Sequence, residues 1–480
     1  MPQQPIAPNS LNRVSGATAF DNQNSLTANP RGPVLLHDYR LLEKPTHFDL
    51  EPIPQLTQQG LPTAAAPTVL RPLGSFEEFF WLIDQNRPLH FALAAQVQGS
   101  TTVGRWRGAL DVVQRRHPLL SVCIDTNGNS HPHFRRETAG PIPLRVVQEN
   151  NVVRRWESEM ERELSIPFDP QQAPLVRAVL LHEANQAVII LVAHHSIADG
   201  LSIAFVIRDL LQALSGHPID LLPVLPAHEE ILGVTRSDAA QAEPSKESNS
   251  TPPARPAIYL RKKDSRPRIK GLRLSSELTG KLRERARQEG TTVHGALSSA
   301  FALAYWQTSH ESREEPIRIC SPIDTRKLLG LGQDCAVLFD AAVVAIEPHT
   351  SSAFWDIARH SIAGLAGAQT LNGISASRNV LHQIVSNGID VPTAAAICAH
   401  AFAHEIMVTN LGNLPYGTDF GKLKLEAVWG PSVSARFEGA VTIGVATTNG
   451  ALCLLETRFA SSDSLLEITE QILISTCAAD

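Results

Sequence analysis

The sequence is poor in cysteine and lacks any long apolar run. Its six cysteines lie far apart among 480 residues, and no two of them form a CxxC pair. This pattern argues against a disulfide framework and favours reduced, buried thiols in a cytosolic protein. No segment reaches the roughly 20 apolar residues that a membrane-spanning helix needs. The N-terminal residues include no apolar run of the kind that is typical of a signal peptide. We therefore expect a soluble cytoplasmic protein without a membrane span.

The sequence also lacks an excess of charge of either sign. Its 42 basic and 48 acidic residues give a net charge of only −6. Without a global basic field, nucleic acid is not expected as a partner. The hydrophobic fraction of 43% and the charged fraction of 19% are typical of a globular protein with a substantial core. The length fits two or three domains, at roughly 100–200 residues each.

The clearest chemical signal is HHSIADG, residues 194–200. The preceding AVIILVA, residues 187–193, is typical of a strand buried on both faces. The following LSIAFVIRDLLQAL, residues 201–214, is typical of a helix. A turn held by two such elements can keep side chains in a fixed geometry, so we expect the chemistry here.

Each residue type in this turn suggests a role. His195 is the candidate general base, because an imidazole with an unperturbed pKa of about 6.5 can take a proton from an alcohol or amine. Asp199 could orient that ring or brace the turn, and Gly200 would permit a sharp bend and a close substrate approach. His194 should point to the opposite face, in a supporting role. The alternative is a pair of core or metal-binding histidines, but no Cys or Glu completes a usual metal spacing, so no metal is expected.

The HHxxxDG pattern resembles the signature of the chloramphenicol-acetyltransferase-like superfamily. This superfamily includes nonribosomal-peptide condensation domains, BAHD acyltransferases and polyketide-associated acyltransferases. The resemblance covers the chain from about residue 71 to the C-terminus. It implies two α/β lobes side by side, with a channel between them and His195 near its middle. It also implies that His195 assists attack on a thioester and that Asp199 is mainly structural.

Two further segments carry the resemblance. IRICSPIDTRKLLG, residues 317–330, is similar to the strand of this superfamily that ends in a proline and an arginine. That similarity implies that Arg326 pairs with Asp199 across the two halves; the alternative is a surface arginine beside Lys327. The TNLG of residues 409–412 is similar to the SNLG strand, which makes Asn410 a candidate for lining the channel.

Other possible site residues are interpreted as structural. His117 precedes a proline at a predicted helix end, and His294 lies near the start of a predicted helix. The DFG of residues 419–421 resembles the BAHD DFGWG box, but Lys422 breaks the pattern, and we regard the likeness as coincidental.

The predicted organisation has an N-terminal arm and two lobes. The boundaries are 1–70 for the arm, 71–216 for the lobe with HHxxxDG, 217–257 for a linker and 258–480 for the second lobe. The linker is rich in Pro, Ser, Glu and Ala, which is typical of a solvated segment.

Residues 21–54 of the arm resemble the N-terminal arm of haem catalases. The catalytic histidine of catalases has no counterpart after Pro54, so no haem chemistry is expected. The arm could drape over the body or exchange between subunits of a homo-oligomer. The alternative to such a role is a flexible leader or a remnant of a gene fusion.

The resemblance implies an acyltransferase of secondary metabolism. The acyl group would pass from a coenzyme A or carrier-protein thioester, as co-substrate, to a hydroxyl or amine of a small molecule; no other cofactor is expected. Without GxSxG, no covalent enzyme intermediate is expected. Residues 261–263 and the Arg115–Arg116 pair are candidates for meeting an acidic carrier, although charge runs are usually solvated faces. Two alternatives stay open: cyclisation of a polyketide or peptide in the same channel, and a non-catalytic binding or scaffold module. The intact motif counts against the last.

Overall fold

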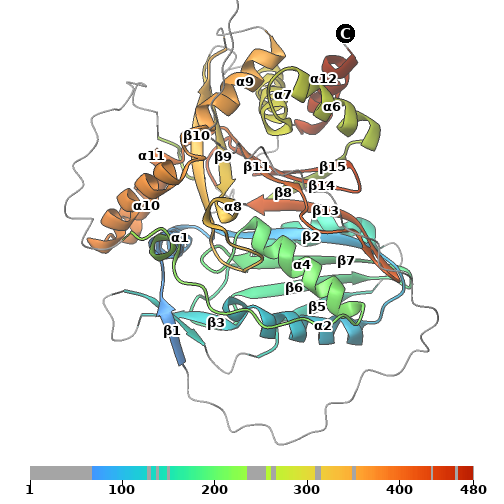
Figure 1. The fold of residues 1–480 in the computed structure, drawn as a ribbon, viewed down its shortest axis with the longest axis vertical. Coiled ribbons are helices and arrows are strands. Elements are labelled where there is room, and N and C mark those ends of the chain that lie inside the picture. The colour runs from blue at the N-terminus through green and yellow to red at the C-terminus, as the bar shows by residue number, and fades with distance from the viewer. Residues whose placement is uncertain are drawn as a thin grey trace, which may run out of the picture. The chain divides into compact units, whose positions relative to one another are not determined.

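Two α/β lobes make up the body of the chain (Figure 1), as predicted. The predicted N-terminal arm lies almost entirely outside the residues that the computed structural model describes. Those are residues 68–126, 131–136, 140–148, 152–234, 256–260, 266–308, 315–348, 353–433, 436–459 and 463–478. Within these ranges no helix combines the length and apolarity needed to cross a bilayer.

The first lobe is built on a six-stranded sheet of order β12-β13-β2-β7-β6-β5. Its strands are β2 (His90–Gln98), β5 (Leu144–Val147), β6 (Val176–His182), β7 (Gln186–His194), β12 (Asp419–Phe420) and β13 (Leu423–Val433). Helices α2 (Val103–Arg116) and α4 (Gly200–Leu214) cover one face, and α3 (Trp156–Leu164) packs on the other.

β7 is buried on both faces, as its apolar run predicts. Alternate residues such as Ile189 and Leu191 join the core beneath α2 and α4. The residues between them, including Ile190 and Val192, join a second cluster with α3 and the second lobe's sheet. Because β7 is buried on both faces, it fixes the position of the turn that follows its last residue.

Several smaller elements complete the first lobe. A three-stranded sheet contains β1 (Thr68–Pro72), β3 (Val122–Asp125) and β4 (His133–Arg136). Helix α1 (Ser75–Asn86) leads from β1 to β2, and α5 (His228–Ile231) lies at the start of the predicted linker.

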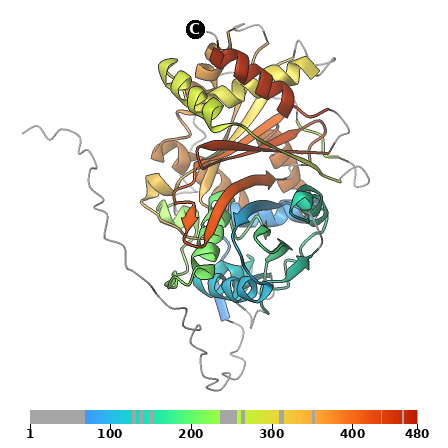
Figure 2. The same ribbon diagram turned by 90° about the vertical axis from the view of Figure 1, so that its right-hand side faces the viewer.

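The second lobe is built on another six-stranded sheet, of order β10-β9-β11-β14-β15-β8. Its strands are β8 (Arg268–Arg273), β9 (Ile317–Asp324), β10 (Phe339–Ile346), β11 (Ile406–Asn413), β14 (Val441–Thr448) and β15 (Ala451–Arg458). The helices that cover its outer face are α6 (Ser276–Gln288), α7 (Val293–Thr308), α9 (Phe354–Leu365) and α12 (Leu466–Ala478). In Figure 2 the yellow and red helices lie on the side of this sheet away from the first lobe.

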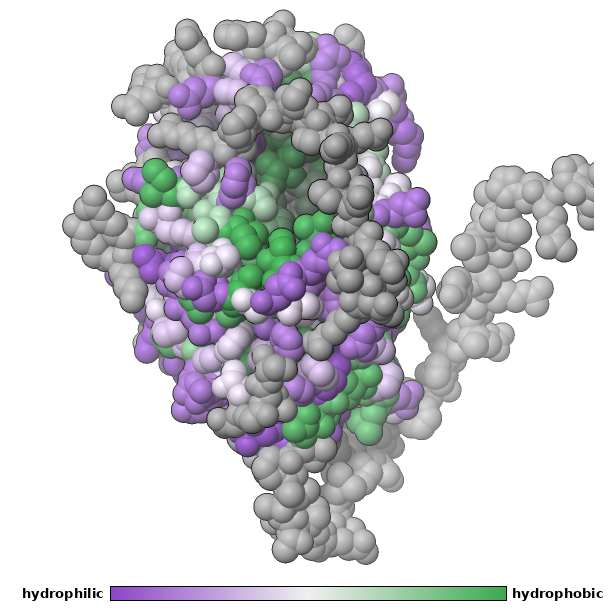
Figure 3. Space-filling view, turned by 90° about the vertical axis from the view of Figure 1, so that its left-hand side faces the viewer, coloured by the Kyte–Doolittle hydropathy of each residue, from purple (hydrophilic) through white to green (hydrophobic). Residues whose placement is uncertain are grey.

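Three more helices lie where the lobes meet. Helices α10 (Leu371–Ser386) and α11 (Val391–Ala401) pack against α1, and the short α8 (Arg326–Leu329) follows β9. Hydrophobic side chains gather around a hollow on the face that Figure 3 shows, which is the side of α10 and α11 in Figure 1.

The sheets do not divide where the chain was predicted to divide. β12 and β13 belong to the predicted second lobe in sequence, yet β13 pairs with β2 in the first sheet, for example Ala427 with Gln96. The two halves are therefore tied together by a shared strand as well as by packing. The exact boundaries near residues 216 and 257 stay a prediction.

Candidate active site

The HHxxxDG residues form the predicted turn between a buried strand and a helix. β7 ends at His194, and α4 begins at Gly200 with Asp199 as its N-cap. His194 is fully buried and faces away from the cavity described below. Its Nδ1 accepts a hydrogen bond from the Ser196 N–H (3.2 Å), and its Nε2 lies 3.4 Å from Asp84 Oδ2. His194 therefore anchors the end of β7 to α1.

A cavity of about 1140 Å³, including its open mouth, lies between the two lobes. The first lobe contributes α1 and the start of α4, and the second lobe contributes β9, β10, β11 and the end of α11. Most of the lining side chains are aromatic or aliphatic. A mainly apolar cleft of this size with a few polar groups is the usual form of a small-molecule site.

His195 lines this cavity within a group of aromatic rings. Its ring centroid lies 4.5 Å from that of Phe80, 4.7 Å from Phe91 and 5.6 Å from Phe339. The side chain is only 7% exposed. Burial lowers the pKa of His195 to about 4, against the smaller opposing effects of nearby backbone groups and Asp199. The imidazole is therefore neutral at pH 7, with a free lone pair.

The geometry also distinguishes the two ring nitrogens of His195. Nδ1 is buried and forms no hydrogen bond of good geometry, although the backbone groups of His195 and Ala198 favour a proton on the ring. Nε2 is not among the buried atoms without a partner, and we infer that it is the ring nitrogen that faces the cavity. In the neutral tautomer that carries its proton on Nδ1, Nε2 presents its lone pair to the cavity.

Asp199 points away from His195 and into a buried network. Its two oxygens accept from Arg326 Nη1 (2.9 Å) and Nη2 (3.0 Å), so the pair is bidentate. They also accept from the Ser202 N–H (2.8 Å), the Ser202 hydroxyl (2.9 Å) and the Leu338 N–H (2.9 Å). Burial alone would raise the pKa of Asp199, but Arg326 and these hydrogen bonds hold it below its usual value. The predicted pairing across the two lobes is present.

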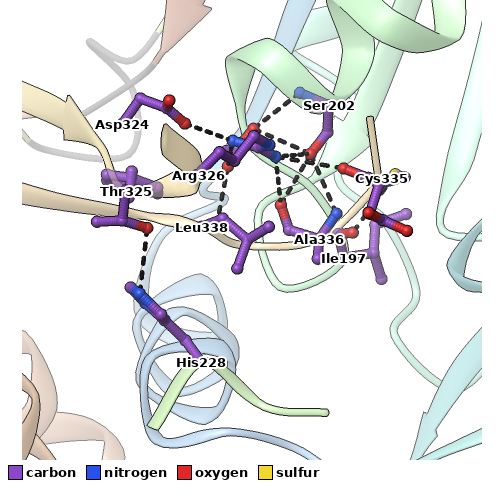
Figure 4. A network of polar contacts seen from close by, with 12 residues as sticks. Ile197, Ser202, His228, Asp324, Thr325, Arg326, Cys335, Ala336 and Leu338 are labelled. Atoms are coloured by element: carbon purple, nitrogen blue, oxygen red, sulfur yellow. Dashed lines mark hydrogen bonds and ion pairs between the residues drawn. The ribbon is translucent and has the colours of Figure 1, made fainter. Parts of the chain in front are cut away.

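Figure 4 shows Arg326 at the centre of this network. Arg326 Nη1 also pairs with Asp324 (2.8 Å), and Nη2 donates to the Ser202 hydroxyl (2.9 Å). Next to it, the Thr325 hydroxyl lies 3.1 Å from Nε2 of His228 on α5. The network therefore links α4, β9 and the start of the predicted linker.

The prediction that Gly200 is needed for a sharp bend is wrong. Its φ lies outside the left-handed region, so no sharp bend requires glycine here. A Cβ at this position would instead lie 2.5 Å from Pro431 Cγ and 3.1 Å from Leu411 Cδ2. Glycine is needed because β13 and β11 pack against the first turn of α4. Gly200 does line the cavity, and the close approach of a substrate to it stays a prediction.

The other predicted site residues are placed as follows. Asn410 lines the cavity, and its Oδ1 accepts from the Gly412 N–H (2.8 Å). His117 is buried against Asp209 (2.9 Å), and His294 lies 2.9 Å from the Ser321 hydroxyl. Neither histidine lines the cavity.

The remaining smaller predictions concern two basic runs, the cysteines, the DFG triplet and metal binding. Arg116 is buried in an ion pair with Asp209 (2.6 Å), so only Arg115 of that pair is free to meet a carrier. Residues 261–263 lie outside the described residues. All six cysteines are free thiols; four are buried as expected, and Cys398 and Cys477 are half-buried. Asp419 and Phe420 form β12, and Asp419 Oδ1 accepts from the Gly421 N–H at its end. In the described part of the chain, no group of His, Cys, Asp and Glu side chains could hold a metal ion.

Sequence reasoning missed the aromatic wall around His195. Phe76, Phe79, Phe80 and Ile83 repeat at the helical spacing i, i+3, i+4, i+7 and all line the cavity. The periodicity indicates that this face of α1 is buried. It does not distinguish a face packed in the core from one that lines a cavity.

Comparison with known proteins places the chain in a family. A model described as "Condensation domain" matches residues 82–328. The chain belongs to the condensation-domain family. The second half also matches a model described as "Phthiocerol/phthiodiolone dimycocerosyl transferase C-terminus", over residues 263–452.

Solved structures share the condensation-domain fold at low sequence identity. Polyketide synthase associated protein 5 from Mycobacterium tuberculosis matches with a TM-score of 0.60 and 18% identity, over 86% of this chain and 99% of that chain. The first condensation domain of the calcium-dependent antibiotic synthetase matches with a TM-score of 0.60 and 16% identity, over 86% and 97%. At these identities the likeness shows the fold alone.

Curated relatives of the condensation-domain body are much longer proteins. Malpinin synthetase from Mortierella alpina is 24% identical over 56% of this chain and 4% of its own length. A linear gramicidin synthase from Brevibacillus parabrevis is 26% identical over 50% of this chain and 5% of its own length. Separately, catalase A from Pseudomonas putida is 56% identical over 45 residues, which is 9% of each protein. The predicted catalase-like arm is thus supported as a resemblance, and its role stays a prediction.

Proposed function

We propose that this protein transfers an acyl group from a coenzyme A or carrier-protein thioester to a hydroxyl or amine of a small molecule. The observation that carries the proposal is the position of His195. A neutral imidazole with an accessible Nε2 lines a large apolar cavity between the two lobes of a condensation-domain fold.

In the proposed reaction, the acceptor oxygen or nitrogen attacks the thioester carbonyl while His195 Nε2 takes its proton. The C–S bond then breaks, and the imidazolium returns the proton to the leaving thiolate, giving an ester or amide and a free thiol. Holding both reactants in one cavity lowers the entropic part of the barrier. Asp199 acts as a positioning residue, because its oxygens are used by Arg326, Ser202 and Leu338.

Thiol release from a panel of acyl-coenzyme A, acyl-pantetheine and acyl-carrier-protein thioesters tests this proposal. Alcohol and amine acceptors are supplied together, and wild type is compared with His195→Ala. Removing a general base should lower the acceptor-dependent rate about 10²- to 10⁴-fold. The matched control is His217→Ala, since His217 is an exposed residue just beyond α4.

The outcomes separate the alternatives. Equal release in wild type and His195→Ala contradicts the role of His195. Release that needs His195 but no acceptor indicates attack by water or by a nucleophile within the acyl chain, and a cyclic product rather than a free acid identifies cyclisation. No release from any of the three kinds of donor contradicts acyl transfer and favours a binding or scaffold module.

A further inference from the structure

The cavity extends well beyond His195 to a second end. Along α1, Phe80 stacks on His195 and Arg87 follows seven residues later as the C-cap. At about 1.5 Å per residue, those positions are about 10 Å apart. Along β9, Asp324 lies beside Arg326 and Cys320 lies four residues earlier. At about 3.3 Å per residue in a strand, those positions are about 13 Å apart.

Strand β11 indicates a similar distance between the two ends of the cavity. Leu411 packs near Gly200, whereas Met407 pairs with Cys320 in the sheet. Both of these β11 residues line the cavity, as do Arg87 and Cys320. We call the region lined by Arg87, Tyr259, Cys320, Cys398 and His404 the far end.

Tyr259 connects the polar groups of the far end. Its hydroxyl donates to the Ala395 carbonyl (3.1 Å). Burial raises the pKa of Tyr259, the neighbouring Cys398 raises it further, and the nearby charge of Arg87 opposes this shift. Its ring lies 5.0 Å from that of Phe437, and the Phe437 ring lies 5.5 Å from that of His404. Arg87 and His404 therefore belong to one region of the wall.

Arg87 brings a positive charge to this wall without a matching carboxylate. Its Nη1 donates to the Asn86 carbonyl (2.9 Å) and its Nη2 to the Leu260 carbonyl (3.3 Å). Its Nε is buried and has no acceptor. Within the described ranges no acidic side chain forms an ion pair with Arg87; nearby Asp84 accepts from the Leu89 N–H and faces His194. A buried donor left unsatisfied is costly, so an acceptor at this position would stabilise the protein.

His404 adds an unused acceptor. Its Nδ1 lies 2.6 Å from the Phe402 carbonyl, so this nitrogen carries the proton and donates it. Nε2 then carries a lone pair and no proton. It is buried without a hydrogen-bond partner, and His404 is only 3% exposed. Burial lowers the pKa of His404 to about 4, so the ring stays neutral. Burial also raises the pKa of Cys398 to about 11, which leaves its thiol uncharged.

We propose that the far end is a binding subsite for a carboxylate or other anionic oxygen at the terminus of a reactant whose reacting group lies at His195. Arg87 donates to that oxygen, and His404 accepts from an adjacent hydroxyl where the reactant has one. The apolar wall between the ends fits an apolar spacer of about 10 Å. This inference rests on the proposed function, because the reactant is taken to be the acyl donor or the acceptor.

Binding to the His195→Ala protein tests the subsite independently of turnover. Calorimetry compares three pantetheine thioethers of equal chain length that end in methyl, hydroxyl or carboxylate. We expect the carboxylate compound to bind about 10- to 100-fold more tightly than the methyl compound, as for a charge-assisted hydrogen bond. The preference should disappear in Arg87→Met and persist in part in Arg87→Lys. Arg283→Met, an exposed change on α6, should leave it intact.

A second arm distinguishes the donor from the acceptor as the source of the carboxylate. Wild type receives either ω-carboxyacyl thioesters with a simple alcohol, or an acetyl thioester with ω-hydroxy acids in place of plain alkanols. Whichever series shows a carboxylate preference that depends on Arg87 identifies the reactant. In the His195→Ala protein, the subsite is overturned if the methyl compound binds equally or better among the pantetheine thioethers and plain alkanols bind as well as ω-hydroxy acids, whether or not thiol release is observed. If Arg87→Met does not fold, Arg87→Lys and the wild-type preference still decide the outcome.

Discussion

The two ends of the cavity differ in how their polar groups are used. At the His195 end, the buried Asp199–Arg326 pair is surrounded by hydrogen-bond partners from α4, β9 and the segment before β10. At the far end, Arg87 donates only to backbone carbonyls and has no ion pair in the described part of the chain. Buried nitrogens without a partner occur at both ends, on Arg326 and His195 as well as on Arg87 and His404, so the difference lies in how the charges are paired. A buried charge pair with several hydrogen bonds fixes geometry, whereas a cation without a carboxylate partner beside a cavity is available to an anionic ligand. This contrast supports the proposals that Asp199 positions the turn and that an anionic group is recognised about 10 Å away along α1.

The largest effect should come from Arg326→Met. Removing this side chain leaves the Asp199 carboxylate buried and uncompensated, which should cost about 3–5 kcal/mol of unfolding free energy. Urea unfolding of the variant and wild type measures the loss. The matched control is Arg87→Met at the far end, which loses only hydrogen bonds to two carbonyls and should cost much less. Equal losses would contradict the contrast between the ends.

The pH dependence of transfer should reveal the aromatic surroundings of His195. His195, the proposed base, would act in its neutral form, so activity should fall as pH drops through its pKa, which burial lowers to about 4 in the wild type. Phe339→Ala admits water to one side of the ring and should move this acid limb towards the unperturbed value of about 6.5. Measuring kcat/KM from pH 5 to 7 should show a loss of activity at pH 5 in the variant only. The control is Phe354→Ala, on α9 in the second lobe, which should leave the pH profile unchanged. A wild-type profile whose acid limb has a pKa near 6.5 would contradict the desolvation of His195.

Gly200→Ala should have an intermediate effect. The new Cβ would lie 2.5 Å from Pro431 Cγ, so β13 or α4 must shift. Overpacking of this kind costs about 1–3 kcal/mol and should also lower kcat/KM, because it displaces the wall beside His195. Gly108→Ala on α2 is the control: its Cβ meets nothing within 4 Å, and alanine should add about 0.5–1 kcal/mol of stability. A neutral result for Gly200→Ala would mean that the lobes adjust freely at this contact.

The smallest effect should come from Asn410→Ala. Asn410 lines the cavity, but its Oδ1 is used by the Gly412 N–H. Losing that hydrogen bond should cost about 1 kcal/mol of stability and change kcat/KM less than about tenfold. A loss above about 100-fold would place Asn410 in the chemistry rather than in the wall.

The local elements and the chemically distinct turn could be predicted from the amino-acid sequence. The apolar run of β7, the apolar helix after it and HHxxxDG between them predicted a strand, a turn and a helix, and these are present. The resemblance to a known superfamily also predicted that Arg326 meets Asp199, 127 residues away in the chain. These features depend on local periodicity or on a motif, and both can be read along the chain.

The remaining features depend on how distant segments pack in the folded chain. The exchange of β13 into the first sheet depends on pairing with β2, more than 300 residues earlier, which no local pattern marks. The lowered pKa of His195 depends on rings from α1, β2 and β10 that converge on it. The far end depends on single side chains from α1, β9, α11 and two loops, including Arg87, Tyr259 and His404. Burial and convergence of this kind arise from contacts between residues far apart in sequence, so they become visible only once the chain has folded.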